Sequence, residues 1–289
     1  MSITTQSLSE TYTRPDIKSR AKLAMGRTQP VGYARIFALP KFPTATDREL
    51  NIYEHLTKVH STHGGQSLIH LKTDNLMLSL EDNTMLVDFA KAEAEDPSPR
   101  KQIDKCRIIY KSRSFRRPAG NKSYGLPILC DFGEARIGKK QESGPFVQPH
   151  IYRAPEIIFE MPWGNAVDIW NLAALIWDLF EGEHLFGDIF DTKGGHDPFK
   201  HLALMVGLIG PPPSEFVKRS ETTEQCFDST GSWVALEDAT VPSVSLESLE
   251  RRLSGQEKES FLRFMRSMLK WLPEERKTAN QLLQDPWLL

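Results

Sequence analysis

Two tripeptides constrain this chain more than any other feature, namely Asp131-Phe132-Gly133 and, further along, Ala154-Pro155-Glu156. The first follows directly on an apolar run over 126–130, which is typical of a short buried strand. An aspartate on a tight, glycine-containing turn after such a strand is suited to hold Mg²⁺ against phosphate groups. The two tripeptides in this order are much harder to obtain by chance than either one alone.

The composition is that of an ordinary globular protein. Of the 289 residues, 39% are hydrophobic and 26% are charged, and the net charge of −2 argues against a general polyanion binder. The three cysteines show no C-x-x-C spacing, so we expect neither a disulfide framework nor a zinc site, and a reducing compartment, cytoplasmic or nuclear. The N-terminus lacks a secretory pattern, and the longest apolar stretch, 169–180, is too short to span a bilayer, so we expect no membrane partner.

The first half of the chain predicts short, interrupted elements. Residues 1–30 are polar without periodicity, and we expect a disordered extension there. An apolar run over 32–42 predicts a strand, and apolar positions at helical spacing predict a helix over about 46–59. Two further strand candidates, 76–80 and 84–89, flank a turn-forming Glu-Asp-Asn, which predicts a β-hairpin.

The second half is strongly helical. Its apolar periodicity predicts helices over 155–160, 166–180, 197–209, 246–253, 257–269 and 278–283. The helix over 166–180 is apolar on most faces, so we expect it at the centre of the core. Gly210 and the three prolines after it stop the helix over 197–209.

Six further segments, together with the two tripeptides, carry a family resemblance. They are Leu71-Lys-Thr-Asp-Asn-Leu76, Asp168-Ile-Trp-Asn-Leu172, Ile176-Trp-Asp-Leu-Phe180, His201-Leu-Ala-Leu-Met205, Leu208-Ile-Gly-Pro211 and Leu272-Pro-Glu-Glu-Arg276. With them the chain resembles protein kinases of the SR-protein kinase group, in the form common in filamentous fungi, from about Asp47 to the C-terminus. The two tripeptides would then bound the activation segment.

The resemblance implies a fold and a domain organisation. The fold is α+β and protein-kinase-like, with a mainly helical C-lobe, a short β-hairpin and a remnant of the N-lobe. We expect the N-lobe remnant, a strand plus helix C, over 31–65. The C-lobe would occupy 66–289, with a basic insert at about 92–125.

The resemblance also implies roles for single residues around bound ATP. Asn75 and Asp131 would be the Mg²⁺ ligands, and Lys72 would be the catalytic-loop lysine near the transferred phosphate. Gly133 would form the turn after Asp131. The partner implied is an Arg/Ser-rich protein substrate, and we expect a monomer.

Four residues take structural roles by the same resemblance. Glu49 would be the helix-C glutamate, and Asp168 would brace the catalytic loop from its helix. Glu156 would pair with Arg276 in the C-lobe.

The catalytic loop departs from the family pattern. In H-R-D-L-x-x-x-N the catalytic Asp stands five residues before the Asn, and counting back from Asn75 gives His70. An equally good interpretation makes His70 the motif's own histidine, with two residues deleted before Leu71. In both cases the carboxylate that would accept the substrate hydroxyl proton is absent, although a histidine can do acid-base work in principle.

The region before the catalytic loop is also short. Only 20 residues separate Leu50 from His70, whereas two strands, the hinge and two helices need on the order of 50. We therefore expect that the hinge which grips adenine is missing. No G-x-G-x-x-G precedes Gly32, and the strand lysine is ambiguous between the position of Arg35 or Ile36 and Lys41.

Two charged stretches have alternative interpretations. Residues 100–122 hold nine Lys or Arg against one acid, Asp104. This is typical of a nuclear-localisation or nucleic-acid patch, but we favour a solvated surface insert and do not expect direct nucleic-acid binding. The stretch 178–197 suits docking of Arg/Ser-rich peptides by charge complementarity. Its six acids are Asp178, Glu181, Glu183, Asp188, Asp191 and Asp197.

The sequence leaves two functional hypotheses. The first is a serine/threonine protein kinase that phosphorylates Arg/Ser-rich, splicing-related proteins with ATP and Mg²⁺, with impaired activity in this chain. The alternative is a catalytically inactive pseudokinase or truncated product that acts, if at all, as a binding protein.

Overall fold

The computed structural model describes residues 67–68, 76–78, 84–104, 107–113, 127–130, 135–137, 140–142 and 148–289. The chain divides into two compact units, one formed by 1–43 with 74–130 and the other by 44–73 with 131–289. The extension, strand and helix predicted over 1–30, 32–42 and 46–59 lie outside the described residues. Within the described residues, no helix is both long and apolar enough to cross a membrane.

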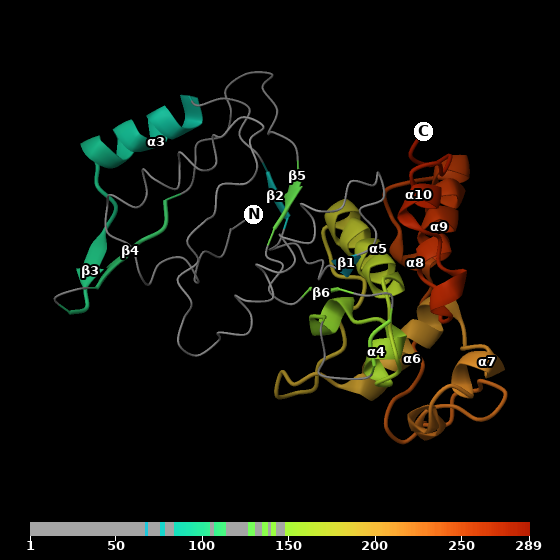
Figure 1. Cartoon of the computed structure of the whole chain (residues 1–289). Coiled ribbons are helices and arrows are strands. Elements are labelled where there is room, and N and C mark those ends of the chain that lie inside the picture. Colours follow the sequence, from blue (N-terminus) through green and yellow to red (C-terminus); the bar gives the residue numbers. More distant parts are fainter. Residues whose placement is uncertain are drawn as a thin grey trace. The chain divides into compact units, whose positions relative to one another are not determined.

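The second unit is mainly helical (Figure 1). Its described elements are β1 (Ser67–Leu68), β6 (Arg136–Ile137), η2 (His150–Tyr152), α4 (Pro155–Ile158), α5 (Ala166–Glu181), α6 (Pro198–Ile209), α7 (Ser214–Val217), η3 (Glu221–Gln225), α8 (Leu246–Leu249), α9 (Gly255–Met268), η4 (Pro273–Glu275) and α10 (Ala279–Leu282). β1 and β6 form a short antiparallel ladder. All six helices predicted for the second half are confirmed, with ends that differ by a few residues.

Local chemistry sets the ends of the two central helices. Asp197 caps α6, because its side chain accepts a hydrogen bond from the Lys200 amide at 3.0 Å, and Pro198 occupies the first turn. Gly182 ends α5 with φ 80°, a left-handed conformation that glycine adopts without steric cost. These ends position the loop 182–197 between the two helices.

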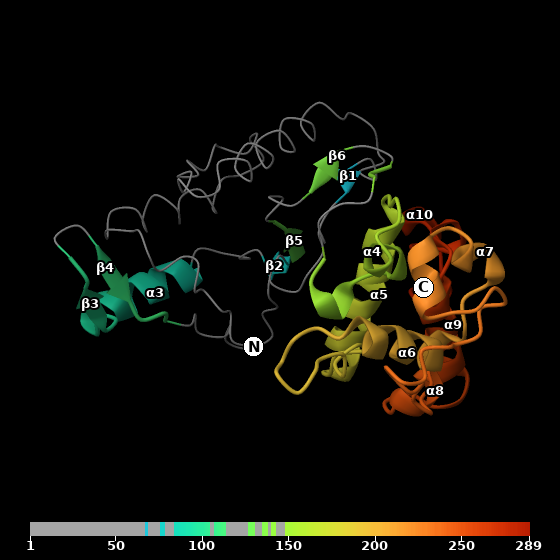
Figure 2. The ribbon, with the colours of Figure 1, turned by 90° about the horizontal axis from the view of Figure 1, so that it is seen from below.

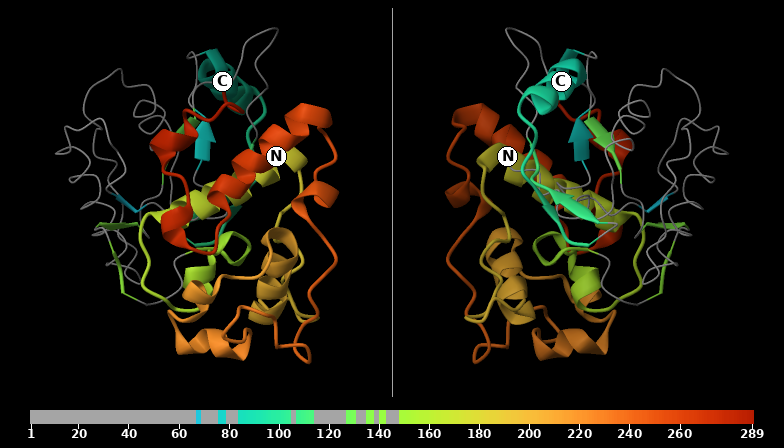
Figure 3. Two further views of the ribbon diagram at one scale, coloured as in Figure 1. Left: turned by 90° about the vertical axis from the view of Figure 1, so that its right-hand side faces the viewer. Right: turned by 90° about the vertical axis from the view of Figure 1, so that its left-hand side faces the viewer.

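α5 lies at the centre of the core, as its apolar character predicts. Its buried side chains are Val167, Trp170, Asn171, Ala173, Ala174, Leu175 and Trp177. Figure 3 shows α9 against α5, and the Phe261 ring of α9 packs on Trp177 and Phe180 with centroids 6.0 and 4.8 Å away. The Trp287 ring also packs on Phe261, with centroids 4.9 Å apart. These aromatic contacts join the C-terminal helices to α5.

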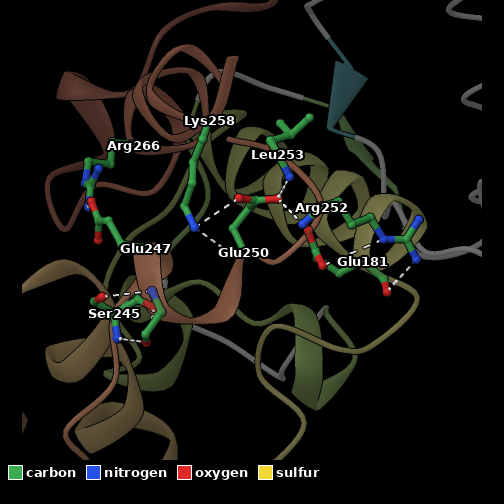
Figure 4. Close-up of polar contacts among 9 residues, drawn as sticks. Glu181, Ser245, Glu247, Glu250, Arg252, Leu253, Lys258 and Arg266 are labelled. Atoms are coloured by element: carbon green, nitrogen blue, oxygen red, sulfur yellow. Dashed lines mark hydrogen bonds and ion pairs between the residues drawn. The ribbon is translucent and has the colours of Figure 1, made fainter. Parts of the chain in front are cut away.

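A buried glutamate fixes the connection between α8 and α9 (Figure 4). One Glu250 carboxylate oxygen accepts hydrogen bonds from the Arg252 and Leu253 amides, each at 2.6 Å, and Lys258 lies 3.2 Å from the other oxygen. Burial alone would raise the pKa of Glu250, but these donors lower it below its ordinary value. Arg252 in turn donates to the Glu181 carbonyl at the end of α5, so this connection is held on the central helix.

The first unit contains one described helix and two antiparallel ladders. Its elements are β2 (Leu76–Leu78), α3 (Thr84–Glu95), β3 (Arg100–Gln102), β4 (Ile108–Tyr110) and β5 (Pro127–Leu129). β2 pairs with β5, and β3 pairs with β4 to form a hairpin that follows α3 (Figure 2). Part of the predicted basic insert therefore forms a regular hairpin.

The hairpin predicted over 76–80 and 84–89 is wrong. Residues 76–78 do form a strand, but its partner is β5, with Leu76 opposite Leu129, and residues 84–95 form a helix. The cause lies beyond residue 89, where Ala-Lys-Ala-Glu-Ala-Glu supplies strong helix formers and a Lys91–Glu95 pair one turn apart at 3.8 Å. A short apolar window does not distinguish a strand from the first turns of such a helix.

Candidate functional site

The structure describes only some of the residues that the sequence singles out. Glu156, Asp168 and Arg276 are described, and Asp168 lies half-buried in the first turn of α5. The others lie outside the described residues, and they are Glu49, His70, Lys72, Asn75, Asp131 and Gly133. In the sequence, β2 begins directly after Asn75 and β5 ends two residues before Asp131, and the register places those two strand ends opposite each other.

Glu156 and Arg276 form a buried, bidentate ion pair. The two terminal guanidinium nitrogens donate to the two carboxylate oxygens at 2.6 and 2.7 Å, and the side chains are 2% and 0% exposed. Arg276 also donates to the carbonyls of Lys270 and Ala166 and lies over the Trp170 ring at 5.2 Å. The pair therefore ties the Ala-Pro-Glu segment to α5 and to η4.

Gln148 fixes the segment that leads into Ala154-Pro155-Glu156. Its side-chain nitrogen donates to the Val167 carbonyl at 3.0 Å, and its side-chain oxygen accepts from the Ala154 amide at 2.9 Å. Arg153 closes the same turn by donating to the Gln148 carbonyl at 3.2 Å, and burial lowers the pKa of Arg153. Gln148 is not among the residues predicted from the sequence, because no spacing rule marks a single buried glutamine.

Asp178 holds the tyrosine that precedes Arg153. The Tyr152 hydroxyl donates to Asp178 Oδ2 at 2.7 Å, His184 Nδ1 lies 2.6 Å from the same oxygen, and the Leu185 amide donates to Oδ1 at 3.2 Å. The Asp178 side chain is only 8% exposed. This carboxylate is therefore committed to contacts within the chain and is not available to a docking peptide.

Three histidine rings lie together at the segment 148–156, and His150 belongs to that segment. The ring of His150 stacks on His196 with centroids 4.4 Å apart, and His196 Nε2 lies 3.1 Å from Nδ1 of the fully buried His201. His201 Nε2 has no hydrogen-bond partner among the described residues. A buried N–H without an acceptor is costly, so the favoured tautomer of His201 donates from Nδ1 to a neutral His196.

The electrostatics of this cluster favour neutral rings. Burial, then the neighbouring His150 and Arg153, lower the pKa of His196 to about 4, while Asp197 opposes the shift. Burial and the nearby His196 lower the pKa of His201 well below its ordinary value. Among the described residues, no group of three or more His, Cys, Asp or Glu side chains is arranged to hold a metal ion.

The acidic stretch over 178–197 divides into two parts. Asp178 and Glu181 are largely buried. Glu183, Asp188 and Asp191 are exposed, although Asp191 Oδ1 also accepts from the Lys193 and Gly195 amides. Of the six acids in the sequence pattern, these three are exposed, while Asp197 is half-buried and caps α6.

A comparison with protein families settles the class of this fold. The protein kinase domain family matches residues 121–288. The chain belongs to the protein kinase family. Its kinase C-lobe explains the mainly helical second unit and the bidentate pair that anchors the Ala-Pro-Glu segment.

Named relatives are also kinases. A serine/threonine protein kinase of Aspergillus fumigatus is 45% identical over 208 residues, which is 72% of this chain and 51% of that protein. The probable serine/threonine-protein kinase sky1 of Dictyostelium discoideum is 33% identical over 63% of this chain and 28% of its own length. The serine/threonine-protein kinase SRPK of Physarum polycephalum is 30% identical over 56% of this chain and 39% of its own length. This kinase-family chain spans about half the length of its Aspergillus relatives.

Proposed function

We propose that this chain is an Arg/Ser-directed serine/threonine kinase C-lobe that binds basic, serine-rich protein segments and transfers phosphate slowly. The observation that carries the substrate class is the exposure of three acids, Glu183, Asp188 and Asp191, on the loop that follows α5. A relative named SRPK supports the same class. Acidic side chains on an open loop attract arginine-rich peptides by charge complementarity.

ATP and Mg²⁺ are the co-substrate and metal that protein kinases use. By resemblance Asn75 and Asp131 would hold the metal and Lys72 would offset developing charge on the transferred phosphate. The β2–β5 ladder supports this proposal because its two paired ends lead in sequence to Asn75 and to Asp131. The contribution of the described residues is to anchor the segment 148–156 that leads to and includes the Ala-Pro-Glu motif, through Gln148 and the Glu156–Arg276 pair.

Slow transfer follows from the sequence of the catalytic loop. No carboxylate stands five residues before Asn75, where His70 is found instead. A positioned general base contributes roughly 10²- to 10⁴-fold to rate. A binding protein without catalysis is the second candidate function, and the same missing carboxylate favours it.

Two assays on the full chain separate these functions. The first measures phosphate transfer from MgATP to an Arg/Ser repeat peptide, with Asp131→Ala as the inactive control. We expect a rate about 10²-fold or more below that of an intact SR-protein kinase, and abolished in the control. A rate equal to that of the intact kinase would refute impaired transfer, and no transfer together with peptide binding would favour the binding protein.

The second assay measures binding of the same peptide by fluorescence anisotropy. Each exposed ion pair is worth about 0.2–1 kcal/mol, so replacing Glu183, Asp188 and Asp191 by their amides should weaken binding about tenfold. The amides keep side-chain shape and the turn at Asp191. The control replaces the exposed Glu257 and Glu259 of α9 by Gln, and it should leave the affinity within twofold. Equal loss in both variants would contradict a local docking surface.

A further inference from the structure

The hairpin of the basic insert arranges its charges by face. The composition of the insert favours a solvated surface without nucleic-acid binding, but composition does not show on which side of a strand each charge lies. β3 and β4 form three residue pairs (Figure 2). Two backbone hydrogen bonds continue the same register at both ends, from the Lys111 amide to the Pro99 carbonyl at 2.7 Å and from the Ile103 amide to the Arg107 carbonyl at 2.9 Å. The hairpin therefore has five successive pairs.

One face of this hairpin carries a line of three cations. Side chains alternate between the two faces of a strand, and partners across a ladder share a face, so the first, third and fifth pairs lie on the same face. These pairs contain Lys111, Lys101 and Arg107 respectively, and all three side chains are exposed. Two residues of a strand span about 7 Å. The cations therefore follow one another at intervals of about 7 Å along the strand direction.

Most of this positive charge is not neutralised within the hairpin. Neither Lys101 nor Lys111 forms an ion pair with any residue that the structure describes, and Arg107 lies 3.5 Å from Asp104 with both side chains about half exposed. The aliphatic Ile103, opposite Arg107, is 39% exposed. The face thus combines free cations with accessible apolar surface.

Contacts with α3 hold the base of the hairpin. The Ser98 hydroxyl and amide donate to the Glu93 carboxylate at 2.6 and 2.9 Å. Arg113, just after β4, lies 3.4 Å from the Glu93 carboxylate and 3.0 Å from that of Asp96. These contacts join both ends of the hairpin to the end of α3, so the line of cations stands on a fixed base.

We propose that this face, formed by Lys101, Arg107 and Lys111, binds the phosphate backbone of a single-stranded nucleic acid without reading its base sequence. A single strand carries one charge per nucleotide at regular spacing, and its sugars and bases can contact the aliphatic side chains between the cations. An extended acidic peptide fits less well, because its successive side chains point to opposite sides. The local field of the hairpin decides this binding, not the net charge of the whole chain. The proposal does not depend on the proposed function.

The test measures binding of a fluorescein-labelled oligouridine of roughly 10 nucleotides to the full chain, by anisotropy over a range of KCl concentrations. Each phosphate contact with a single strand adds about 0.7 to the slope of log association constant against log salt. Lys101→Gln and Lys111→Gln should each reduce this slope by about 0.7 and weaken binding about threefold. Lys111→Arg keeps the charge and should keep the slope.

Arg100→Gln is the matched control. Arg100 is also exposed and removes the same charge, but it belongs to the second pair and lies on the opposite face. This variant should leave slope and affinity unchanged, and an equal loss in Arg100→Gln and Lys101→Gln would overturn the proposal. Hydrogen exchange of the Lys111 amide, which donates to the Pro99 carbonyl, verifies that the hairpin is intact in each variant.

Two other results would also overturn the proposal. One is no binding of the oligonucleotide by the wild-type chain at low salt. The other is equal or tighter binding of a glutamate peptide of the same charge, or of vesicles that contain anionic lipid. The proposed function is measured separately with a basic peptide, so failure of one proposal does not hide failure of the other.

Discussion

Replacing Glu156 by Gln tests how the C-lobe is held together. The substitution keeps the shape of the side chain and removes its charge. Arg276 would then remain in a fully buried position without a counter-charge, and its partners would be the Lys270 and Ala166 carbonyls, the Trp170 ring and the one oxygen of the new amide. The carboxylate supplies two charge-assisted hydrogen bonds at 2.6 and 2.7 Å, and an amide oxygen replaces only one of them without charge.

The expected loss is large because the other partner stays charged and buried. Breaking a buried ion pair by removing one partner costs about 3–5 kcal/mol, a substantial share of a stability of roughly 5–15 kcal/mol. For a domain of about 150–250 residues, 1 kcal/mol shifts Tm by roughly 2–4 °C. We therefore expect Tm of Glu156→Gln to fall by about 6–20 °C.

The measurement is thermal and urea unfolding followed by circular dichroism. Glu274→Gln is the matched control, since Glu274 also pairs with an arginine, Arg219, but both side chains are partly exposed. That control should cost about 1 kcal/mol or less. The double variant Glu156→Leu with Arg276→Met should recover at least half of the loss, because apolar side chains of similar volume replace buried pairs at little cost. A Tm for Glu156→Gln within 3 °C of wild type would refute the reasoning.

Two further predictions concern the segment before Arg153 and the histidine that stacks on it. His196 has a pKa near 4 in the folded chain and about 6.5 when unfolded. Its contribution to stability is therefore complete above pH 6.5 and is lost as pH falls toward 4. The urea midpoint of unfolding should be lower at pH 5 than at pH 7, and the difference should be smaller in His196→Gln; an equal difference in both chains would exclude this histidine as a cause. Tyr152→Phe removes a 2.7 Å hydrogen bond to the buried Asp178 carboxylate and should lower the free energy of unfolding by about 1.5–3 kcal/mol, measured by urea unfolding; no change would mean that the bond does not form in solution.

The helices of the second unit could be predicted because their signals are local. Apolar spacing marked α5, α6 and α9, and Gly210 with its prolines marked the end of α6. The strand over 76–78 was also marked, but its partner was not. Leu76 pairs with Leu129, far away in the sequence, and pairing across that separation leaves no periodic trace.

In the candidate site, too, contacts between residues far apart in the sequence could not be predicted from local patterns. The Glu156–Arg276 contact came from a family resemblance, since no local rule joins residues 120 positions apart. Gln148 was missed altogether, although its side chain satisfies a carbonyl of α5 and the Ala154 amide. The interpretation of Asp178 as a docking acid was wrong because charge in a sequence does not reveal burial.

The contacts that anchor the Ala-Pro-Glu segment bear on whether peptide binding and phosphate transfer can be separated in this chain. The described ones lie among residues 148–185 and 270–276. A C-lobe stabilised by these contacts can keep the three exposed acids of the loop 182–197 in place whether or not phosphate is transferred. Under the proposed function, binding of a basic peptide and chemistry on that peptide would be separable properties, and this chain would compete for the same segments as an active kinase.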